Sequence, residues 1–408
     1  IARPGSPWGV WGMRHLENTS GALEALGLYG LECESLEPIQ SGGPKALWKA
    51  TSAGRSYALK RFRHPPEKVA FSTAAQRYVH EKGARVAALL KSRAGADYVV
   101  VNGQVFAVYE FIEGKPVSWD NPSQFRRSVE SLADFHARSR GYSPPPGCLV
   151  SSKIGRWPEQ YRSITERLKV WSTAAQGMSD PFCRLFLKNS GWAVQLGEFA
   201  RRLLDRFGYT ALVREFEKHA GLCHQDYGEG NCTEREDIVF ILDLDGVTFD
   251  LPARDIRKTV VKTLADRGSW SQAAADEIVS WFDSVNPLSP RGWAATYTDV
   301  LFPHAFHDVA KNRGVEGGLP GAVRRVDDRL AGPSVTVERL MSFAEVCSDR
   351  RGGIHRLQPC GPAARGRLGS DWDRLIRPVL PAVNQGAEPA RRGVSRRRAP
   401  RRRAVHLC

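Results

Sequence analysis

Apolar and polar residues alternate along two pairs of short segments in the first part of the chain. Alternation with a period of two is typical of strands that have one buried face. Asn102-Gly103, between the second pair, is the favoured sequence for a tight type I′ turn. Both pairs are predicted hairpins: residues 46–51 with 57–62, and residues 97–101 with 104–111. Helical spacing predicts a short helix from Ser20 and a second helix over residues 66–82, which would be inserted between the hairpins.

Beyond Gly114, apolar residues recur at every third or fourth position, which predicts amphipathic helices. These are expected over residues 122–139, 158–175, 193–220, 253–266, 271–285 and 293–310. One strand pair stands out among them, residues 238–242 with 247–249. The order predicts an α+β protein in which a small antiparallel sheet lobe precedes a larger helical lobe.

Four segments follow from these patterns and from composition. Residues 1–31 would form an N-terminal extension with the short helix, 32–112 the sheet lobe, and 113–330 the helical lobe. Residues 331–408 are rich in Arg, Pro and Gly and have few large apolar residues, so we expect a tail without a packed core.

The net charge of +15 is concentrated at the C-terminal end. Residues 350–408 hold 15 Arg, no Lys and three acidic residues, whereas the remaining residues carry 44 basic against 41 acidic side chains. A basic tail can bind nucleic acid through phosphate contacts, but this one lacks interleaved aromatic residues and any known reading motif. Nucleic-acid binding is therefore a distant alternative.

The sequence shows no 18-residue apolar run, and its first residues lack the pattern of a secretory signal. The eight cysteines include no CxxC pair, which argues against a structural zinc site or a disulfide scaffold. We expect a protein of a reducing cytoplasm that does not span a membrane.

The most informative stretch is residues 224–231, followed by an apolar run that ends at Asp243. Transfer of a γ-phosphoryl group needs a carboxylate beside the attacking hydroxyl and oxygen ligands for Mg²⁺. In this interpretation Asp226 positions or deprotonates the acceptor, Asn231 and Asp243 bind the metal, and His224 braces the loop. The alternative is that these side chains only cap turns in a fold without activity.

The sheet lobe carries the candidates for nucleotide binding. Lys60 lies on a predicted strand, where its ammonium group could meet the α- and β-phosphates of ATP. Gly42 and Gly43, in the loop before that hairpin, could cover the phosphates with backbone N–H groups. At the end of the sheet lobe, the backbone of Glu110 and Ile112 could form a hinge that contacts the adenine edge.

Three runs of residues resemble a known family: HQDYGEGN at 224–231, LDLDGVTFDLP at 242–252 and FPHAFH at 302–307. Together with the strand lysine, they are similar to the CotS family of spore-coat proteins, in the aminoglycoside phosphotransferase branch of the protein-kinase-like fold. The resemblance covers about residues 20–315. It implies a bilobal kinase-like fold, ATP and Mg²⁺ as cofactors, and a place in the cytoplasm of the sporulating mother cell and in the spore coat.

Two functions are compatible with the resemblance. The first is an ATP-dependent phosphotransferase that acts on a hydroxyl of a small molecule or of a coat component. The second is a structural or interaction protein of the coat, with other coat proteins as partners and little or no turnover. Kinase-like enzymes usually pair the strand lysine with a Glu of the next helix, but here Glu67 and Glu81 lie only at the ends of that helix. This departure favours the second function, whereas the intact set of Asp226, Asn231 and Asp243 favours the first.

Other polar residues have competing interpretations. Asp245 could assist the metal, but a role in the following turn is preferred. Asp255 could anchor the loop at 224–231, cap a helix or form a surface salt bridge. His136 is most simply a packing residue. Helical spacing places three possible ligands on one face, for which packing is preferred over metal binding: His304, His307 and Asp308.

Overall fold

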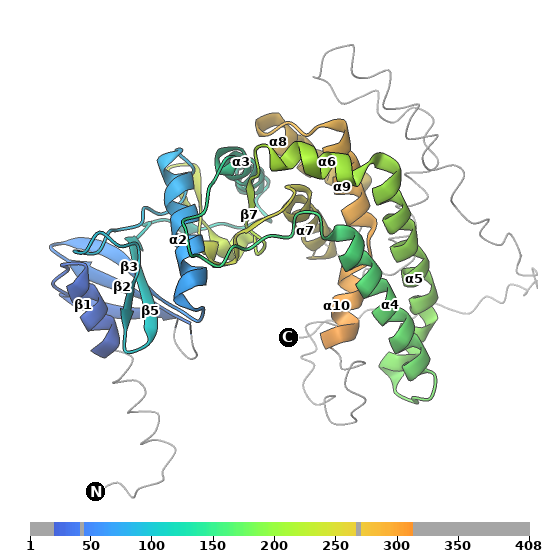
Figure 1. Ribbon diagram of the computed structural model, residues 1–408, viewed down its shortest axis with the longest axis horizontal. Coiled ribbons are helices and arrows are strands. Elements are labelled where there is room, and N and C mark those ends of the chain that lie inside the picture. Colours follow the sequence, from blue (N-terminus) through green and yellow to red (C-terminus); the bar gives the residue numbers. More distant parts are fainter. Residues whose placement is uncertain (1–19, 41–44, 267–270, 313–408) are drawn as a thin grey trace, which may run out of the picture. The chain divides into compact units, whose positions relative to one another are not determined.

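The structure is a computed structural model, which describes residues 20–40, 45–266 and 271–312 (Figure 1). A five-stranded antiparallel sheet contains β1 (Ser35–Gln40), β2 (Ala46–Ser52), β3 (Arg55–Phe62), β4 (Val99–Val101) and β5 (Gln104–Glu110), in the order β1-β2-β3-β5-β4. Both predicted hairpins are confirmed. Asn102 and Gly103 have φ values of 50° and 74°, as a type I′ turn requires.

Helices cover both faces of the sheet. On one face, residues 20–28 form a helix whose Ala22, Ala25 and Leu26 pack against Trp48 and Phe106. The short helix predicted as part of an extension is therefore part of the sheet lobe's core. On the other side lies α2 (Pro66–Glu81), which Figure 1 shows between the sheet and the remaining helices.

The remaining helices follow the five-stranded sheet in the sequence. They are α3 (Pro122–Ser139), α4 (Trp157–Ala175), α5 (Pro181–Phe207), α6 (Tyr209–Glu217), α7 (Ala253–Asp266), α8 (Gln272–Val285), α9 (Pro290–Leu301) and α10 (His304–Asn312). No helix among the described residues is long and apolar enough to cross a membrane.

Two predicted helices are each two helices in the structure. The segment predicted at 193–220 breaks at Gly208, whose φ of 81° ends α5 in the left-handed region. The segment predicted at 293–310 breaks after Leu301, because Pro303 has no N–H to continue the hydrogen-bond pattern. Hydrophobic periodicity continues across both breaks, so it could not show them.

The predicted pairing of residues 238–242 with 247–249 is wrong. β9 (Ile238–Ile241) pairs with β8 (Cys232–Arg235), which in turn pairs with β6 (Lys115–Pro116). β10 (Thr248–Phe249) pairs instead with β7 (Leu222–Cys223). The hairpin turn of β8 and β9 is formed by Glu236 and Asp237, which adopt positive φ without a glycine to mark it in the sequence.

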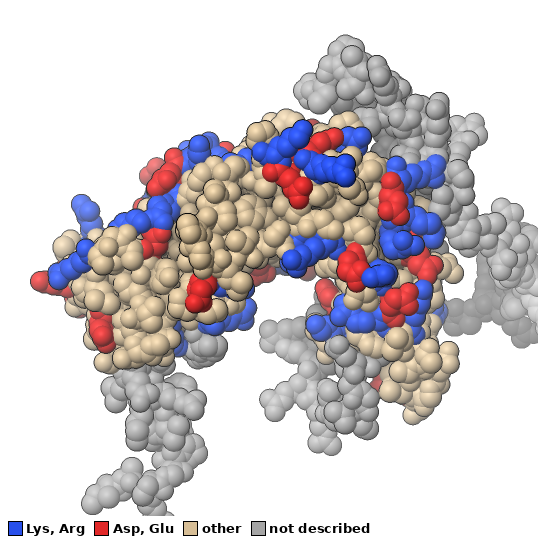
Figure 2. Space-filling view, in the orientation of Figure 1, with Lys and Arg blue, Asp and Glu red and all other residues tan. Residues whose placement is uncertain are grey.

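Charge is mixed on the surface of the described residues. On the face shown in Figure 2, Lys and Arg lie among Asp and Glu and form no continuous basic surface. The prediction of a tail without a packed core concerns residues outside those that the structure describes.

Candidate active site

One buried carboxylate, that of Asp255, binds the backbone of the loop at residues 224–231. Asp255, in the first turn of α7, accepts hydrogen bonds from the backbone N–H groups of His224 at 2.6 Å and Gln225 at 3.0 Å. His136 Nε2 of α3 donates to the same carboxylate at 3.0 Å. Of the interpretations of Asp255, the loop anchor is confirmed, and His136 has a polar role besides packing.

The charge of this carboxylate is stabilised by its partners. Burial would raise the pKa of Asp255, but the hydrogen bond from His136 and the nearby Lys258 lower the pKa to about 2. Asp255 is therefore ionised at neutral pH and can hold the strained start of the loop, where Gln225 has a φ of 72°.

His224 braces the loop from inside. Its Nε2 donates to the carbonyl oxygen of Leu242 at 2.9 Å, and its Nδ1 accepts from the Asp226 N–H at 3.3 Å. These two bonds fix one neutral tautomer, and burial lowers the pKa of His224 accordingly. The predicted bracing role of His224 is confirmed by these contacts.

Asp226 and Asn231 lie at the two ends of this loop and are brought together. Asn231 Nδ2 donates to the backbone oxygen of Asp226 at 2.7 Å. The Asp226 side chain is exposed and borders a pocket of about 610 Å³, which Asn231 also lines. A carboxylate open to a pocket of this size can reach a hydroxyl of a small molecule.

Asp243 follows β9 and links the helical lobe to the sheet. Its Oδ1 lies 2.8 Å from Lys60 Nζ of β3, and its Oδ2 lies 2.5 Å from Lys45 Nζ. Burial alone would raise the pKa of Asp243, but these two lysines hold it well below the usual range. Asp245 also pairs with Lys60, and its Oδ2 lies 3.6 Å from Lys45. The two lysines of the sheet lobe therefore contact two carboxylates that lie far from them in the sequence.

Lys60 takes its carboxylate partners from the segment after β9 and not from α2. Glu67 and Glu81 of α2 are exposed, and the carboxylates paired with Lys60 are those of Asp243 and Asp245. Asp245 therefore does more than stabilise the following turn, because its carboxylate also pairs with Lys60.

The predicted hinge follows β5. The Glu110 N–H is already used, because it donates to the backbone oxygen of Ala88 at 2.8 Å. This leaves the Glu110 carbonyl, with its two lone pairs, and the backbone of the largely buried Ile112 as possible contacts for an adenine edge. A Cβ at Gly114 would lie 2.8 Å from the Glu234 backbone oxygen, so the chain can pass β8 there only as glycine. Gly42 and Gly43 lie outside the described residues.

Two groups of side chains have the composition of a transition-metal site. In the first group, His304 Nε2 lies 2.8 Å from Asp299 Oδ1, a buried carboxylate that also pairs with Arg254 and Arg257, and this hydrogen bond supports packing over metal binding. In the part of the chain described, His136, Cys223 and Asp255 place potential ligand atoms within 4.8 Å of one another. Burial raises the pKa of the Cys223 thiol, and Asp255 already accepts several hydrogen bonds, so the second group also serves the loop.

Comparison with known proteins places this geometry in a family. The family described as "Spore coat putative kinase YutH" matches residues 28–313, well over half of the chain. The chain belongs to this spore-coat family. Spore coat protein S of Bacillus subtilis (strain 168) is 26% identical to it over 284 residues, which are 69% of this chain and 81% of the relative. The predicted CotS resemblance is confirmed.

Solved structures show which fold the spore-coat family member has. An aminoglycoside phosphotransferase from Alicyclobacillus acidocaldarius has a TM-score of 0.64 at 20% identity, covering 78% of this chain and 93% of that one. Amicoumacin kinase hAmiN has a TM-score of 0.50 at 16% identity, covering 81% and 91%. The α+β fold of aminoglycoside phosphotransferases, predicted from the sequence, is confirmed.

Sequence reasoning about this family member missed Lys45. It directly follows Pro44 and the predicted glycine loop, which was the only signal in the sequence. An ion pair between Lys45 and Asp243 joins residues that no local pattern connects. The motif could therefore place Asp243 on the correct loop without showing its partners.

Proposed function

We propose that this spore-coat family member is an ATP- and Mg²⁺-dependent phosphotransferase that transfers a phosphoryl group to a hydroxyl. The observation that carries the proposal is the placement of Lys60 within 2.8 Å of Asp243, beside the loop that holds Asp226 and Asn231. The family description names a kinase. A spectinomycin phosphotransferase of similar fold was solved with ADP, and hAmiN with AMP-PNP and Ca²⁺.

The residues fit a magnesium ion. Asp243 and Asn231 offer hard oxygen ligands, and the depressed pKa keeps Asp243 ionised at every physiological pH. Bound Mg²⁺ would neutralise phosphate charge and orient the group to be transferred. Lys60 and Lys45, which now contact carboxylates, would bind phosphate oxygens. Asp226 would accept the proton of the attacking hydroxyl. Asp255 and His224 would hold the loop that carries Asp226 in position.

The first test is calorimetric titration of ATP into the full chain, with and without Mg²⁺. Asp243→Asn keeps a residue that tolerates the φ of 60° found there, but removes the charge. We expect this variant to bind ATP–Mg²⁺ at least tenfold more weakly, because a charged metal ligand is lost. Asp226→Asn should bind ATP–Mg²⁺ as the wild type does but should lose phosphoryl transfer to the acceptor.

The matched control is Asp237→Asn, which changes an acid at a similar φ on a nearby turn, with a side chain 86% exposed. It should leave ATP binding unchanged. If the folded wild-type protein binds no ATP in the presence of Mg²⁺, the enzyme proposal fails.

A second function is favoured by the way Lys60 is held. Because both carboxylates beside it are neutralised by lysines and α2 supplies no Glu, the fold could serve as an inactive interaction module of the coat. Its partners would then be other spore-coat proteins. For either function we place the protein in the cytoplasm of the sporulating mother cell and in the coat, on the basis of its family. Absence of nucleotide binding would favour this second function.

A further inference from the structure

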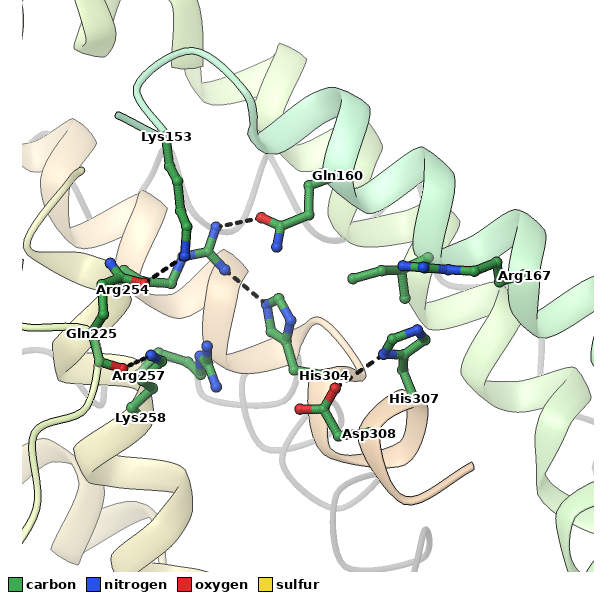
Figure 3. Close-up of a pocket in the computed structure, with 11 residues that line it drawn as sticks. Lys153, Gln160, Arg167, Gln225, Arg254, Arg257, Lys258, His304, His307 and Asp308 are labelled. Atoms are coloured by element: carbon green, nitrogen blue, oxygen red, sulfur yellow. Dashed lines mark hydrogen bonds and ion pairs between the residues drawn. The ribbon is translucent and has the colours of Figure 1, made fainter. Parts of the chain in front are cut away.

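A second, narrower pocket adjoins the one beside Asp226. It has a volume of about 220 Å³ and is lined by side chains from α4, α7 and α10 and by Lys153 (Figure 3). The wider pocket, of about 610 Å³, shares four of its residues: Gln225, Arg257, Lys258 and Asp308. A molecule that places a hydroxyl at Asp226 can therefore extend another group into the narrow pocket.

Cations without a carboxylate partner line this region. Lys153, Arg167 and Lys258 line the narrow pocket and Lys262 the wide one, and none forms an ion pair within 4.0 Å in the described part of the chain. Lys153 donates to Gln225 Oε1 at 2.7 Å, and Lys258 donates to the Gln225 backbone oxygen, so neutral groups hold both lysines. Both bonds are drawn in Figure 3.

One of these cations, Arg167, has a buried donor without a partner among the residues that the structure describes. It extends from α4 toward the pocket, and its buried Nε makes no hydrogen bond to any described residue. A guanidinium group with free donors is well suited to bind a carboxylate or a phosphate.

Nearby acids do not cancel this charge. Asp299 lies 3.0 Å from Arg254 and 3.2 Å from Arg257, so its charge is already used by these two arginines. Asp308, hydrogen-bonded to His307 Nδ1 at 3.1 Å, is the one carboxylate among the described residues that line the narrow pocket, against five Lys and Arg side chains. Burial lowers the pKa of His304 to about 4, so His304 is neutral at pH 7 and neither adds to nor offsets the surplus.

We propose that the acceptor is a small sugar or polyol that carries a phosphate or carboxylate group in addition to the hydroxyl that is phosphorylated. The anionic group enters the narrow pocket and contacts Arg167, Lys153 and Lys258, while the hydroxyl lies at Asp226. This inference rests on the proposed function, since Asp226 is its reference point. The acceptor is taken to be a small molecule because the two adjoining pockets, of about 220 and 610 Å³, have the size of sites that bind small ligands. Cationic acceptors would be repelled.

The test measures acceptor binding without nucleotide, by calorimetry on the full chain. The probes are glucose 6-phosphate, glucuronate, uncharged glucose and the cationic kanamycin. At least one of the two anionic sugars should bind about tenfold more tightly than glucose, as expected for one charge-assisted hydrogen bond. The tighter of the two identifies phosphate or carboxylate as the recognised group. Equal binding of glucose and both anionic sugars, or tighter binding of kanamycin, would overturn the inference.

Arg167→Gln should weaken binding of the anionic sugar about tenfold and leave glucose unchanged. The matched control is Arg162→Gln, on the same helix, with a side chain that is 66% exposed and pairs with Glu159 outside the pocket. An equal effect of both variants would refute a specific role for the pocket. ATP–Mg²⁺ binding is titrated separately: if it is present without a preference for anionic sugars, only this inference fails; if anionic sugars bind but ATP does not, the proposed function fails and the narrow pocket stands as an anion-binding site alone.

Discussion

At the scale of single residues, Asp255 is the side chain on which the candidate site depends most. It lines neither of the two pockets near Asp226, yet it fixes the backbone at His224 and Gln225 and so the position of Asp226. The CotS-like motif made Asp226 visible in the sequence. The sequence indicated the loop anchor as one of three possible roles of Asp255 but could not choose between them, because its contacts join residues about thirty positions apart and His136 from a third element.

The pKa of Asp255 predicts how stability depends on pH. Its pKa is about 2 in the folded protein against 3.8 when unperturbed, so the folded state is stabilised above pH 4 and loses this contribution as the pH falls toward 2. The shift corresponds to about 2 kcal/mol. Asp255→Asn should therefore lower the free energy of unfolding at pH 7 by about 2–3 kcal/mol. Urea unfolding from pH 7 to pH 3 measures it, and the difference between the wild type and the variant should fall to about half by pH 3. A difference that stays constant with pH would contradict the assignment.

At the scale of elements, the hydrophobic pattern predicted those helices and hairpins that are determined by their own local sequence. The two hairpins, α2, α3 and α7 were found because each has its own apolar period within one local segment. The partner of β9 was missed because the turn at Glu236 and Asp237 carries no glycine, and the break at Gly208 was missed because apolar spacing continues across it.

Two glycines, one inside α5 and one that ends it, should respond in opposite ways to the same substitution. Gly208 has a φ of 81°, and a Cβ added there would lie no closer than 3.6 Å to another atom, so Gly208→Ala costs only the left-handed conformation, about 1 kcal/mol. Gly191 lies inside α5, exposed, with nothing within 4 Å of such a Cβ. Gly191→Ala should therefore stabilise the protein by about 0.5–1 kcal/mol. Thermal unfolding compares the two, and equal signs would refute the helix break at Gly208.

At the scale of the whole described domain, the sheet and the helical lobe are joined by opposite charges where ATP is proposed to bind. Lys60 is 8% exposed and Asp245 is 16% exposed, so their attraction is screened less than that of a surface pair. The same ion pairs that hold the lobes together would then have to open when phosphates and Mg²⁺ bind. The coupling energy between Lys60 and Asp245 should therefore differ between the protein with and without ATP–Mg²⁺.

A double-mutant cycle of Lys60→Gln and Asp245→Asn measures that energy. Without nucleotide, urea unfolding should give a coupling of about 1–2 kcal/mol, above the range of exposed pairs. The cycle of Arg291 with Glu215, a pair at 2.6 Å with both side chains nearly half exposed, is the control and should give a few tenths of a kcal/mol. If Lys60 moves to the phosphates, saturating ATP–Mg²⁺ should reduce the first coupling and leave the second unchanged. A first coupling that persists in full with bound nucleotide would show that Lys60 stays with Asp245, and would assign phosphate binding to Lys45 alone.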